Sequence, residues 1–459
     1  MIKRFLPLAF LALSACAASP LTEFPSRAVA PELNLPPTKS FAKAPKPAKI
    51  LEANADLTRD FLELSFEMES GKPINIFSRF EQPITLAFAT QPSPLFQADL
   101  SLLLSRFRNE AGLNIRQTKT GQDANIVIQT LPRRVLRKTV PQAACFVVPR
   151  VKNWAEFRQN RRTGKLDWST LKIRERATVF IPDDIAPQEA RDCLHEEIAQ
   201  SLGPLNDVYR LPKTIFNDDN LVSVLGSFDM LMLKIYYSGE LKSGMSRAQV
   251  ASLLPPILKR LHPEGETLAR DGEKPTPRSW IDAIIIATGP GTSKARRLSN
   301  AAKAVAIARN KNWQDNRLGF SLFAQGRLAL GLEPDLAVES FARAYTTYAS
   351  LYGTDDIHTA QVALQLAAFA LSSGDSQSAL KLINQSLPAA QRSQNASLLA
   401  TLLMIKAEAL DFEGRRAEAA TVRMDSLGWA RYGFGTTNKI RARLREIAAL
   451  RAADKKPEA

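Results

Sequence analysis

A repeating pattern of helices and short turns constrains the second half of this chain more than any other feature. Beyond residue 295 the sequence is rich in Ala and Leu, and turns at residues 331–334, 372–375 and 411–414 separate the helical runs. The turns recur at intervals of roughly 40 residues, with room for two helices in each, which is the period of an α-solenoid. We therefore expect an all-α helical repeat domain over residues 295–450, followed by a polar tail at 451–459. An irregular helical bundle is the alternative architecture.

The repeats also predict a kind of partner. Small residues at the junctions of turn and helix, such as Ala379 and Ala417, resemble those of tetratricopeptide repeats. Most of the larger signature residues of those repeats are missing. The concave face of a solenoid usually binds peptide or protein, so we expect this domain to bind one or the other.

Residues 51–262 show a different pattern, in which short runs of β-forming residues alternate with helical spacing. Strands are expected at 84–89, 113–118, 125–131, 145–149 and 177–181, and helices at 95–111 and 187–203. The order strand, helix, four strands, helix predicts an α+β domain. Residues 151–172 are predicted to be a polar insertion, and the Pro-rich, basic stretch at 263–294 a linker to the repeats.

The N-terminus carries the pattern of an export signal. Lys3 and Arg4 precede an apolar run of nine residues, which is too short to span a bilayer but has the length of a signal-peptide core. The following Leu-Ser-Ala-Cys, ending at Cys16, resembles the lipobox of bacterial lipoproteins, where cleavage leaves an acylated Cys. This resemblance implies a signal peptide at 1–15, a lipid on Cys16 and a disordered tether at 16–50. An ordinary secreted protein cut at the same place is the alternative.

A protein with this signal is expected in the bacterial cell envelope, attached to a membrane by its N-terminal lipid and facing the periplasm. Ala17, rather than Asp, follows the Cys, which favours the outer membrane. The helical repeats are then expected to bind an envelope protein or peptide. The chain has 61 basic and 46 acidic residues, a net charge of +15, but it has no nucleic-acid-binding motif, and we expect no nucleic-acid partner.

The small number of sulfur and imidazole groups limits the available chemistry. Three Cys and three His cannot build a cluster of zinc fingers or an array of iron–sulfur centres. With Cys16 lipidated, Cys145 and Cys193 remain as an even pair in an oxidising compartment, which predicts a disulfide. Two buried free thiols are the alternative.

One segment, residues 193–207, has the residue types of an active site. His195 and Glu196 begin an H-E-x-x-H zinc motif, but Ala199 occupies the position of the second His, so this register fails. A shift of one residue makes the segment similar to the metzincin pattern H-E-x-x-H-x-x-G-x-x-H. Glu197 then takes the position of the general base.

In the shifted register Gly203 falls on the Gly of the metzincin turn, and all three His ligands are replaced. The replaced positions hold Glu196, Gln200 and Asn206. The predicted order of strands and helices is also that of zincins, and residues 223–225 lie where metzincins carry their Met-turn. The resemblance implies a zincin-like α+β domain, followed here by the tetratricopeptide-like repeats.

The same segment resembles a family of exported bacterial proteins of uncharacterised function, whose signature runs E-E-x-x-Q-x-L-G-x-x-N-D. Its last two residues are Asn206 and Asp207 here, and a further Phe-Asn-Asp follows at 216–218. The resemblance covers about residues 80–255. The family supplies no established activity.

The oxygen-bearing residues of this segment suggest two kinds of site. Glu196 and Gln200 are four residues apart and share a helix face. With Asn206, Asp207 and a contribution from His195 they are candidate metal ligands, and an oxygen-rich set favours Ca²⁺, Mg²⁺ or Mn²⁺ over zinc. A hydrogen-bonded polar cluster in a vestigial cleft is the structural alternative.

Two functions are therefore expected. The leading one is an envelope lipoprotein that binds or scaffolds other proteins, with a degenerate metzincin-like domain and protein-binding repeats. The alternative is a metal-dependent, peptidase-like hydrolase that uses a divalent metal ion and Glu197 as general base. The Gly-Pro-Gly-Thr-Ser-Lys at 289–294 lacks the spacing of a phosphate-binding loop and is predicted to be a turn.

Overall fold

The computed structural model describes residues 35–141, 143–272 and 275–450. The predicted signal peptide, the lipidation site Cys16 and the tail at 451–459 lie outside the described residues, as does most of the predicted tether. Within the described part, no helix combines the length and the apolar composition needed to cross a bilayer. From Pro36 onward, the described residues belong to one compact unit.

The N-terminal part is built on a mixed sheet of five strands in the order β2-β1-β3-β5-β4. The strands are β1 (Ile84–Phe88), β2 (Ile115–Gln117), β3 (Ile126–Leu131), β4 (Phe146–Pro149) and β5 (Ala177–Pro182). Four strands run parallel, and β4 pairs antiparallel with β5 at one edge. All six residues of β5 are buried, as expected for a parallel strand that is covered on both faces.

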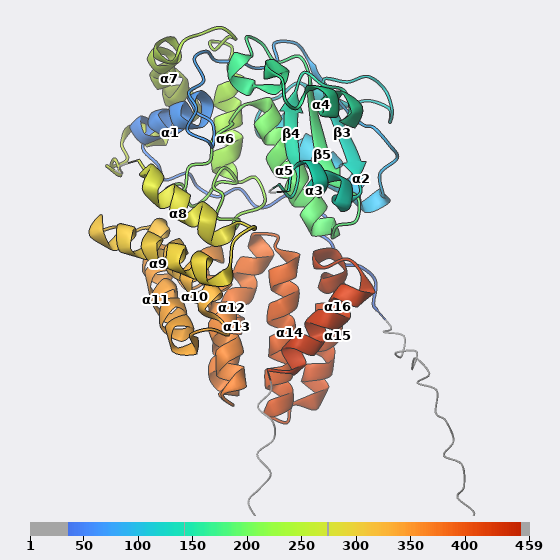
Figure 1. Ribbon diagram of the computed structural model, residues 1–459, viewed down its shortest axis with the longest axis vertical. Coiled ribbons are helices and arrows are strands. Elements are labelled where there is room, and N and C mark those ends of the chain that lie inside the picture. Colours follow the sequence, from blue (N-terminus) through green and yellow to red (C-terminus); the bar gives the residue numbers. More distant parts are fainter. Residues whose placement is uncertain (1–34, 142, 273–274, 451–459) are drawn as a thin grey trace, which may run out of the picture. The chain divides into compact units, whose positions relative to one another are not determined.

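Helices cover both faces of this sheet. The helices of this part are α1 (Asn54–Phe66), α2 (Pro94–Asn109), α3 (Arg133–Thr139), α4 (Trp154–Asn160), α5 (Pro187–Leu202), α6 (Ser227–Tyr236) and α7 (Arg247–Leu261). Helix α5 packs on β4 and β5, and α2 packs on β2 and α5 (Figure 1). Side chains alternate along β5, so that Val179 and Ile181 join the main core while Phe180 packs with Leu136 of α3 and Phe157 of α4.

The expected five strands and two long helices are therefore confirmed, but the connections are richer than predicted. The range 151–172 is more than a polar insertion, because it contains α4 and two short 3-10 helices, η1 (Gly164–Leu166) and η2 (Trp168–Thr170). Phe157 and Trp168 are buried there. Two aromatic residues among many charges were enough to anchor a segment whose average composition is polar.

The C-terminal part is all-helical, as expected. Its described helices are α8 (Arg278–Thr288), α9 (Lys294–Asn310), α10 (Asn316–Ala329), α11 (Pro334–Tyr352), α12 (Ile357–Ser372), α13 (Ser376–Arg392), α14 (Ala396–Phe412), α15 (Arg416–Gly433) and α16 (Thr437–Ala448). Helices α8 to α15 each pack mainly on their neighbours along the chain, and α16 packs on both α14 and α15. Gly374 and Gly414 lie in two of the predicted turns with φ of +86° and +77°, a backbone conformation that glycine adopts without a steric penalty.

Helix α8 corrects the prediction of a linker at 263–294. Another short helix, η3 (Pro263–Glu266), also lies within this range. Trp280, Ala283, Ile284 and Ala287 of α8 are spaced three or four residues apart, so they form one face, and that face is buried in the second hydrophobic core. The prolines of this stretch lie before α8, and averaging them with the residues of α8 hid the helical period of α8.

The described end of the predicted tether is also docked rather than free. We call residues 36–49 the strap. The carbonyl of Pro36 accepts a hydrogen bond from Arg431 (2.8 Å), and the ring of Phe41 lies 4.8 Å from that of Trp429. Further along, the backbone N–H of Ala48 donates to the hydroxyl of Ser227 at the start of α6 (2.9 Å). Composition alone missed these contacts because the partners lie far along the chain.

Candidate functional site

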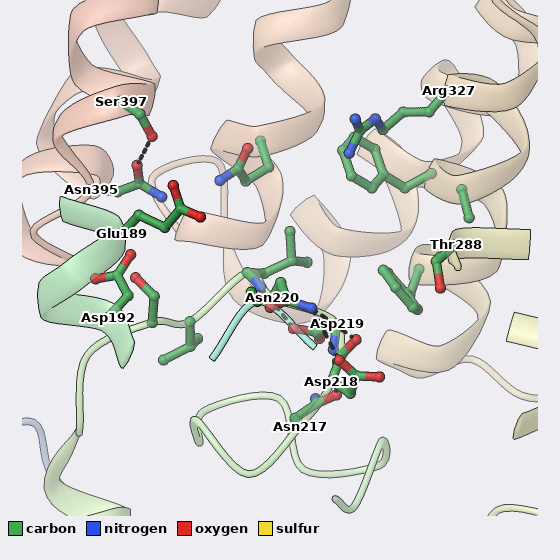
Figure 2. A pocket seen from close by; sticks show the side chains of 18 of the residues that line it. Glu189, Asp192, Asn217, Asp218, Asp219, Asn220, Thr288, Arg327, Asn395 and Ser397 are labelled. Atoms are coloured by element: carbon green, nitrogen blue, oxygen red, sulfur yellow. Dashed lines mark hydrogen bonds between the residues drawn. The ribbon is translucent and has the colours of Figure 1, made fainter. Parts of the chain in front are cut away.

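Helix α5 presents a polar face to a cavity of about 970 Å³. The helix begins with Pro187 in its first turn, where the missing N–H costs no hydrogen bond. Gln188, Asp192 and Glu196 follow at intervals of four residues and therefore share one face, and all three line the cavity. Residues 217–223 line the cavity next to α5, and helices α8, α9 and α10 supply a further wall (Figure 2).

Contacts between the two parts of the chain hold the walls of this cavity in place. Gln188 on α5 donates from its amide to the side chain of Asn395 before α14 (3.2 Å). Asn316 on α10 donates to the carbonyl of Tyr209 (2.6 Å), and the ring of Tyr209 packs edge-on against Trp280 at 5.2 Å. The cavity is thus built from residues of both the α/β part and the helical part.

Several carboxylates influence one another near the α5 side of this cavity, and two of them, Glu196 and Asp218, line it. We call Glu69, Glu196, Glu197, Asp207 and Asp218 the carboxylate cluster. Burial, followed by the negative charges of Asp218, Glu69 and Asp192, raises the pKa of Glu196 to about 8. The pKa of Asp207 is also held well above its usual range, first by burial and then by Glu69 and Asp218. Glu197 is buried and Glu196 and Asp207 are partly buried, whereas Glu69 and Asp218 are exposed. Like charges near one another favour proton uptake by the buried members.

Glu197 is the most enclosed member of the cluster. Its side chain is only 4% exposed, and its pKa is raised well above the usual range by burial and then by the charges of Glu196 and Glu69. The backbone of Val147 on β4 forms a hydrogen bond with this carboxyl group. The second oxygen, Oε2, has no hydrogen-bond partner among the described residues. A buried polar atom without a partner is uncommon and calls for an explanation.

The wall of the cavity formed by α9 and α10 is basic. Arg297 donates to the carbonyls of Ala287 (2.8 Å) and Thr288 (3.2 Å) at the end of α8. Arg327 lies over the ring of Phe323, and among the described residues the charged groups that act on it are Arg297 and Arg443, with no acidic side chain. Burial lowers the pKa of Arg327, and the positive charges of Arg297 and Arg443 lower it further. This wall therefore carries positive charge that its own neighbours do not neutralise.

The predicted site residues separate into two groups. Glu196, Glu197 and Asp207 come together in the carboxylate cluster. His195 does not join them: it is buried on the other side of α5, where its Nδ1 accepts a hydrogen bond from the backbone N–H of Leu225 (3.2 Å). Burial lowers the pKa of His195 well below its usual range, so the ring is neutral and acts as a structural acceptor.

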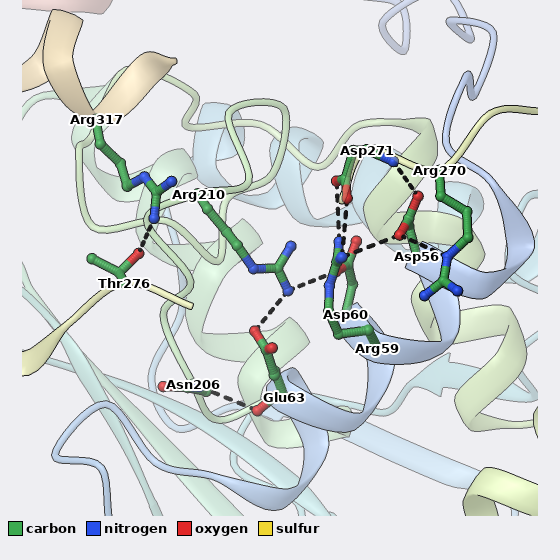
Figure 3. A network of polar contacts seen from close by, with 10 residues as sticks. All are labelled: Asp56, Arg59, Asp60, Glu63, Asn206, Arg210, Arg270, Asp271, Thr276 and Arg317. Carbon is green, nitrogen blue, oxygen red and sulfur yellow. Dashed lines mark hydrogen bonds and ion pairs between the residues drawn. The ribbon is translucent and has the colours of Figure 1, made fainter. Parts of the chain in front are cut away.

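Asn206 also bonds elsewhere. Its amide donates to the carbonyl of Glu63 on α1 (3.2 Å), and the carboxylate of Glu63 in turn binds Arg210 at 2.6 Å (Figure 3). Arg210 is fully buried and also binds Asp60 at 2.6 Å, so the chain after α5 is tied firmly to α1. Gln200 is half-buried, and its backbone carbonyl accepts a hydrogen bond from Arg174 (2.7 Å).

The predicted metal ligands are not brought together at one point among the described residues. Among these, no three His, Cys, Asp or Glu side chains are arranged so that they can hold a metal ion. Sequence reasoning missed Glu69 and Asp218 as members of the cluster. The Phe-Asn-Asp at 216–218 could have indicated Asp218. No neighbouring residue pattern indicates Glu69, which lies in the turn after α1.

The predicted disulfide is confirmed. Cys145, just before β4, is bonded to Cys193 on α5, and both residues line the cavity. The bond fastens the edge of the sheet to the helix that carries Glu196.

The fold and the site define an α/β domain with a carboxylate-lined cavity, followed by a helical region. Residues 54–256 match a family described as a protein of unknown function (DUF2927). The match confirms the expected resemblance to an uncharacterised family, and it includes the whole sheet and the whole carboxylate cluster. Helices α8 to α16 lie outside it. No curated protein and no solved structure matches the chain.

Proposed function

We propose that this protein is a binding protein whose cavity, between α5 and the helical region, receives a segment of a partner protein or a peptide. The observation that carries the proposal is the composition of the cavity, whose walls come from both parts of the chain. A segment bound there contacts the α/β part and the helical part at once. Its volume of about 970 Å³ is at the upper end of the range for ligand-binding pockets.

We further propose that the protein acts in the bacterial cell envelope as a lipoprotein anchored through Cys16. This part of the proposal is supported by the sequence pattern of the first 16 residues alone. The disulfide between Cys145 and Cys193 is in keeping with an oxidising compartment. The partner is accordingly an envelope protein or peptide, and nucleic acid is not proposed.

The residues at the metzincin-like positions favour binding over catalysis. We include in this proposal that the domain is zincin-like. The three positions that carry His in metzincins hold Glu196, Gln200 and Asn206, and the amide of Asn206 is engaged with α1. A domain of this kind keeps the cleft of an enzyme while using it for recognition.

One observation supports the alternative function, a metal-dependent, peptidase-like hydrolase. Glu197 has a buried, unpartnered oxygen and a raised pKa, both of which are common for a general acid or base. In that case Glu197 would exchange a proton with the water molecule that attacks the substrate. A divalent metal ion would supply the activation of that water, but within the described residues no three acidic, His or Cys side chains are arranged to hold one.

Site-specific crosslinking in cells tests whether a partner occupies the cavity. A photoreactive amino acid is placed at Asn220 or Gln361, both in the cavity wall, and at the exposed Lys381 on α13 as the matched control. We expect one discrete adduct from the two cavity positions and none from the control. Absence of the adduct at both cavity positions refutes the binding function.

The same cells then test Glu197. In a binding protein, Glu197→Gln retains both the adduct and the wild-type phenotype, because binding does not require Glu197 to accept or donate a proton. In a hydrolase, Glu197→Gln retains or strengthens the adduct but abolishes the phenotype.

A further inference from the structure

The strap crosses α15 at a position where the helix has no side chain. The backbone N–H of Lys39 donates to the carbonyl of Gly428 (3.0 Å), and the Lys39 ammonium forms an ion pair with Asp425. Gly428 is buried, and a β-carbon added there would lie 3.1 Å from the Lys39 side chain. A glycine inside a helix costs stability, so its presence here is explained by the close passage of the strap.

Phe41 is the second anchor of the strap, and it covers a buried guanidinium group. Its ring lies 4.8 Å from that of Trp429 and, edge-on, 6.3 Å from that of Tyr432. The guanidinium of Arg191 on α5 lies 5.7 Å from the centre of the Phe41 ring and 5.6 Å from that of Tyr432. Arg191 is only 3% exposed, so the strap joins α15 to α5 through a cation packed against two aromatic rings.

The first connection from the strap to the cavity runs along α5. Arg191 donates two hydrogen bonds, of 3.1 and 2.7 Å, to one oxygen of Asp192, which lines the cavity. The other oxygen of Asp192 accepts a longer bond of 3.4 Å from Gln188, which also lines the cavity. A displacement of the Arg191 guanidinium therefore reaches two side chains of the cavity wall.

The second connection runs through the turn before α14. The buried amide of Gln394 donates to the carbonyl of Lys43 in the strap (2.7 Å). The next residue, Asn395, accepts a bond from Gln188 (3.2 Å), and the backbone N–H of Ser397 donates to the same glutamine (2.9 Å). Figure 2 shows Asn395 and Ser397 beside α5. The strap, the start of α14 and α5 thus form one connected set of hydrogen bonds.

The docked strap leaves a buried donor unsatisfied. Nη1 of Arg191 has no hydrogen-bond partner among the described residues. A buried donor without an acceptor is destabilising, and departure of the Phe41 ring gives water access to the guanidinium. The strap has no helix or strand of its own, and most of its residues are exposed. Docking is therefore opposed by a local cost, as expected for a segment that opens without unfolding of the rest.

We propose that the strap is a releasable clasp on the cavity. While it is docked, it holds α5 against α15 and the start of α14, and the wall that carries Gln188 and Asp192 stays in place. When it is released, this wall loosens and the cavity binds its occupant less tightly. Coupling of this kind is reciprocal, so an occupied cavity also favours the docked strap.

This inference rests on the proposed binding function and adds its regulation. The strap is the described end of the segment that leads back to the proposed lipid site at Cys16. A pull on that segment acts first on the strap, and through Arg191 and Gln394 it reaches the cavity. The position of the membrane anchor thereby controls binding.

The coupling is tested first by hydrogen exchange in the isolated full chain with its disulfide intact. Phe41→Ala removes the anchor of the strap. We expect the backbone N–H of Ser397, together with residues 36–49, to exchange about tenfold faster, while α12 keeps its rates. Phe412→Ala is the matched control, because Phe412 is an exposed aromatic residue at the other end of α14. It should leave exchange at Ser397 unchanged.

A second variant weakens the strap while it favours the fold of α15. Gly428→Ala improves the helix propensity of α15, but its β-carbon crowds the Lys39 side chain. We expect faster exchange at Ser397, with a smaller increase than in Phe41→Ala. Thr421→Ala, which also improves helix propensity at an exposed position of α15, should leave it unchanged. Faster exchange that is confined to the strap in both strap variants overturns the inference.

Crosslinking in cells from Asn220 or Gln361 then measures the effect on binding. At equal amounts of protein, we expect Phe41→Ala to lower the yield of the adduct about fivefold and Phe412→Ala to leave it unchanged. An equal or higher yield in Phe41→Ala overturns the inference. Failure of the binding function is a different result, because it removes the adduct from the wild type as well. The exchange measurements need no ligand, so they still decide whether the strap controls the wall.

Discussion

The phenol of Tyr432 donates a hydrogen bond of 2.9 Å to the carboxylate of Asp99, and this buried contact joins α15 to α2 across 333 positions of the chain. Burial raises the pKa of Asp99 to about 6, although the hydrogen bond from Tyr432 and the charge of Arg191 oppose the increase. Asp99 is therefore ionised at pH 8 and largely protonated at pH 5. The contact is one of the bonds that hold the helical region against the α/β part.

Replacement of Tyr432 by Phe should weaken this junction in a pH-dependent way. The variant leaves a buried carboxylate without its donor, which costs about 1–3 kcal/mol of unfolding free energy. The loss should be larger at pH 8 than at pH 5, because the bond favours the ionised form. Urea unfolding at the two pH values measures it. Tyr345→Phe, whose hydroxyl has no hydrogen bond in the described structure, is the control, and an equal loss at both pH values would contradict the assignment.

Glu196 should make the protein less stable as the pH rises. Its pKa is about 8 in the folded state and near the ordinary value of 4.5 in the unfolded state. Between these values the folded state binds more protons, so the unfolding free energy falls as the pH increases through this window.

Glu196→Gln removes that proton and should flatten the curve. At pH 8 we expect the variant to be more stable than wild type by about 1–4 kcal/mol: the rise of the pKa from 4.5 to about 8, at about 1.4 kcal/mol per unit, sets the upper limit, and the partial exposure of the side chain reduces it. Thermal unfolding from pH 5 to pH 8 measures the slope. Glu333→Gln in an exposed turn is the control. Parallel curves for wild type and Glu196→Gln would show that Glu196 is ionised at neutral pH.

The disulfide should contribute strongly to stability. It closes a loop of 48 residues, and the chain-entropy relation gives about 4 kcal/mol for a loop of that length. We expect a reducing agent to lower the guanidinium midpoint of the wild type. The double variant Cys145→Ser with Cys193→Ser should already be shifted and should not respond to reductant. A wild type that is indifferent to reduction would show that the bond does not form in the isolated protein.

The strap should depend on Phe41. Its ring contacts Trp429, and the guanidinium of Arg191 lies 5.7 Å from the centre of the ring. Phe41→Ala removes half-buried aromatic area and should cost about 1–2 kcal/mol. Hydrogen exchange in residues 36–49 should increase in this variant, whereas Lys46→Ala, an exposed position in the same segment, should leave exchange unchanged. Unaltered exchange in Phe41→Ala would mean that backbone contacts alone hold the strap.

Gly203 illustrates how a sequence pattern can be correct for an unexpected reason. The metzincin-like register assigned it to a turn, where freedom of the backbone is the usual requirement. Its φ of −167° is ordinary extended backbone. A β-carbon at this position would lie 2.8 Å from the ring of Tyr236, so the glycine is required by close packing between the end of α5 and α6. The sequence around Gly203 does not indicate this packing, because Tyr236 is distant in the chain.

The carboxylate cluster shows where sequence reasoning stops. Glu196, Glu197 and Asp207 were found because they lie within one helix and the loop that follows it, where spacing predicts which side chains share a face. Asn206 and His195 were expected beside them, but contacts with Glu63 and Leu225 turn them elsewhere. Spacing along a helix says which face a residue occupies and not which element will cover that face.

The sequence by itself determined the features that depend on near neighbours: the five strands, the helices of the repeat region, the disulfide pairing of Cys145 with Cys193, and the polar face of α5. The hydrophobic period and the turn residues depend on neighbours a few positions apart, and the even number of cysteines depends on composition alone. These features can therefore be predicted before the fold is known. Only the tertiary structure brought Arg327 to the wall opposite Glu196, Glu69 into the cluster and the strap onto α15. These relationships join segments that are far apart in the chain, and they arise from the way helices and sheet pack to bury apolar surface.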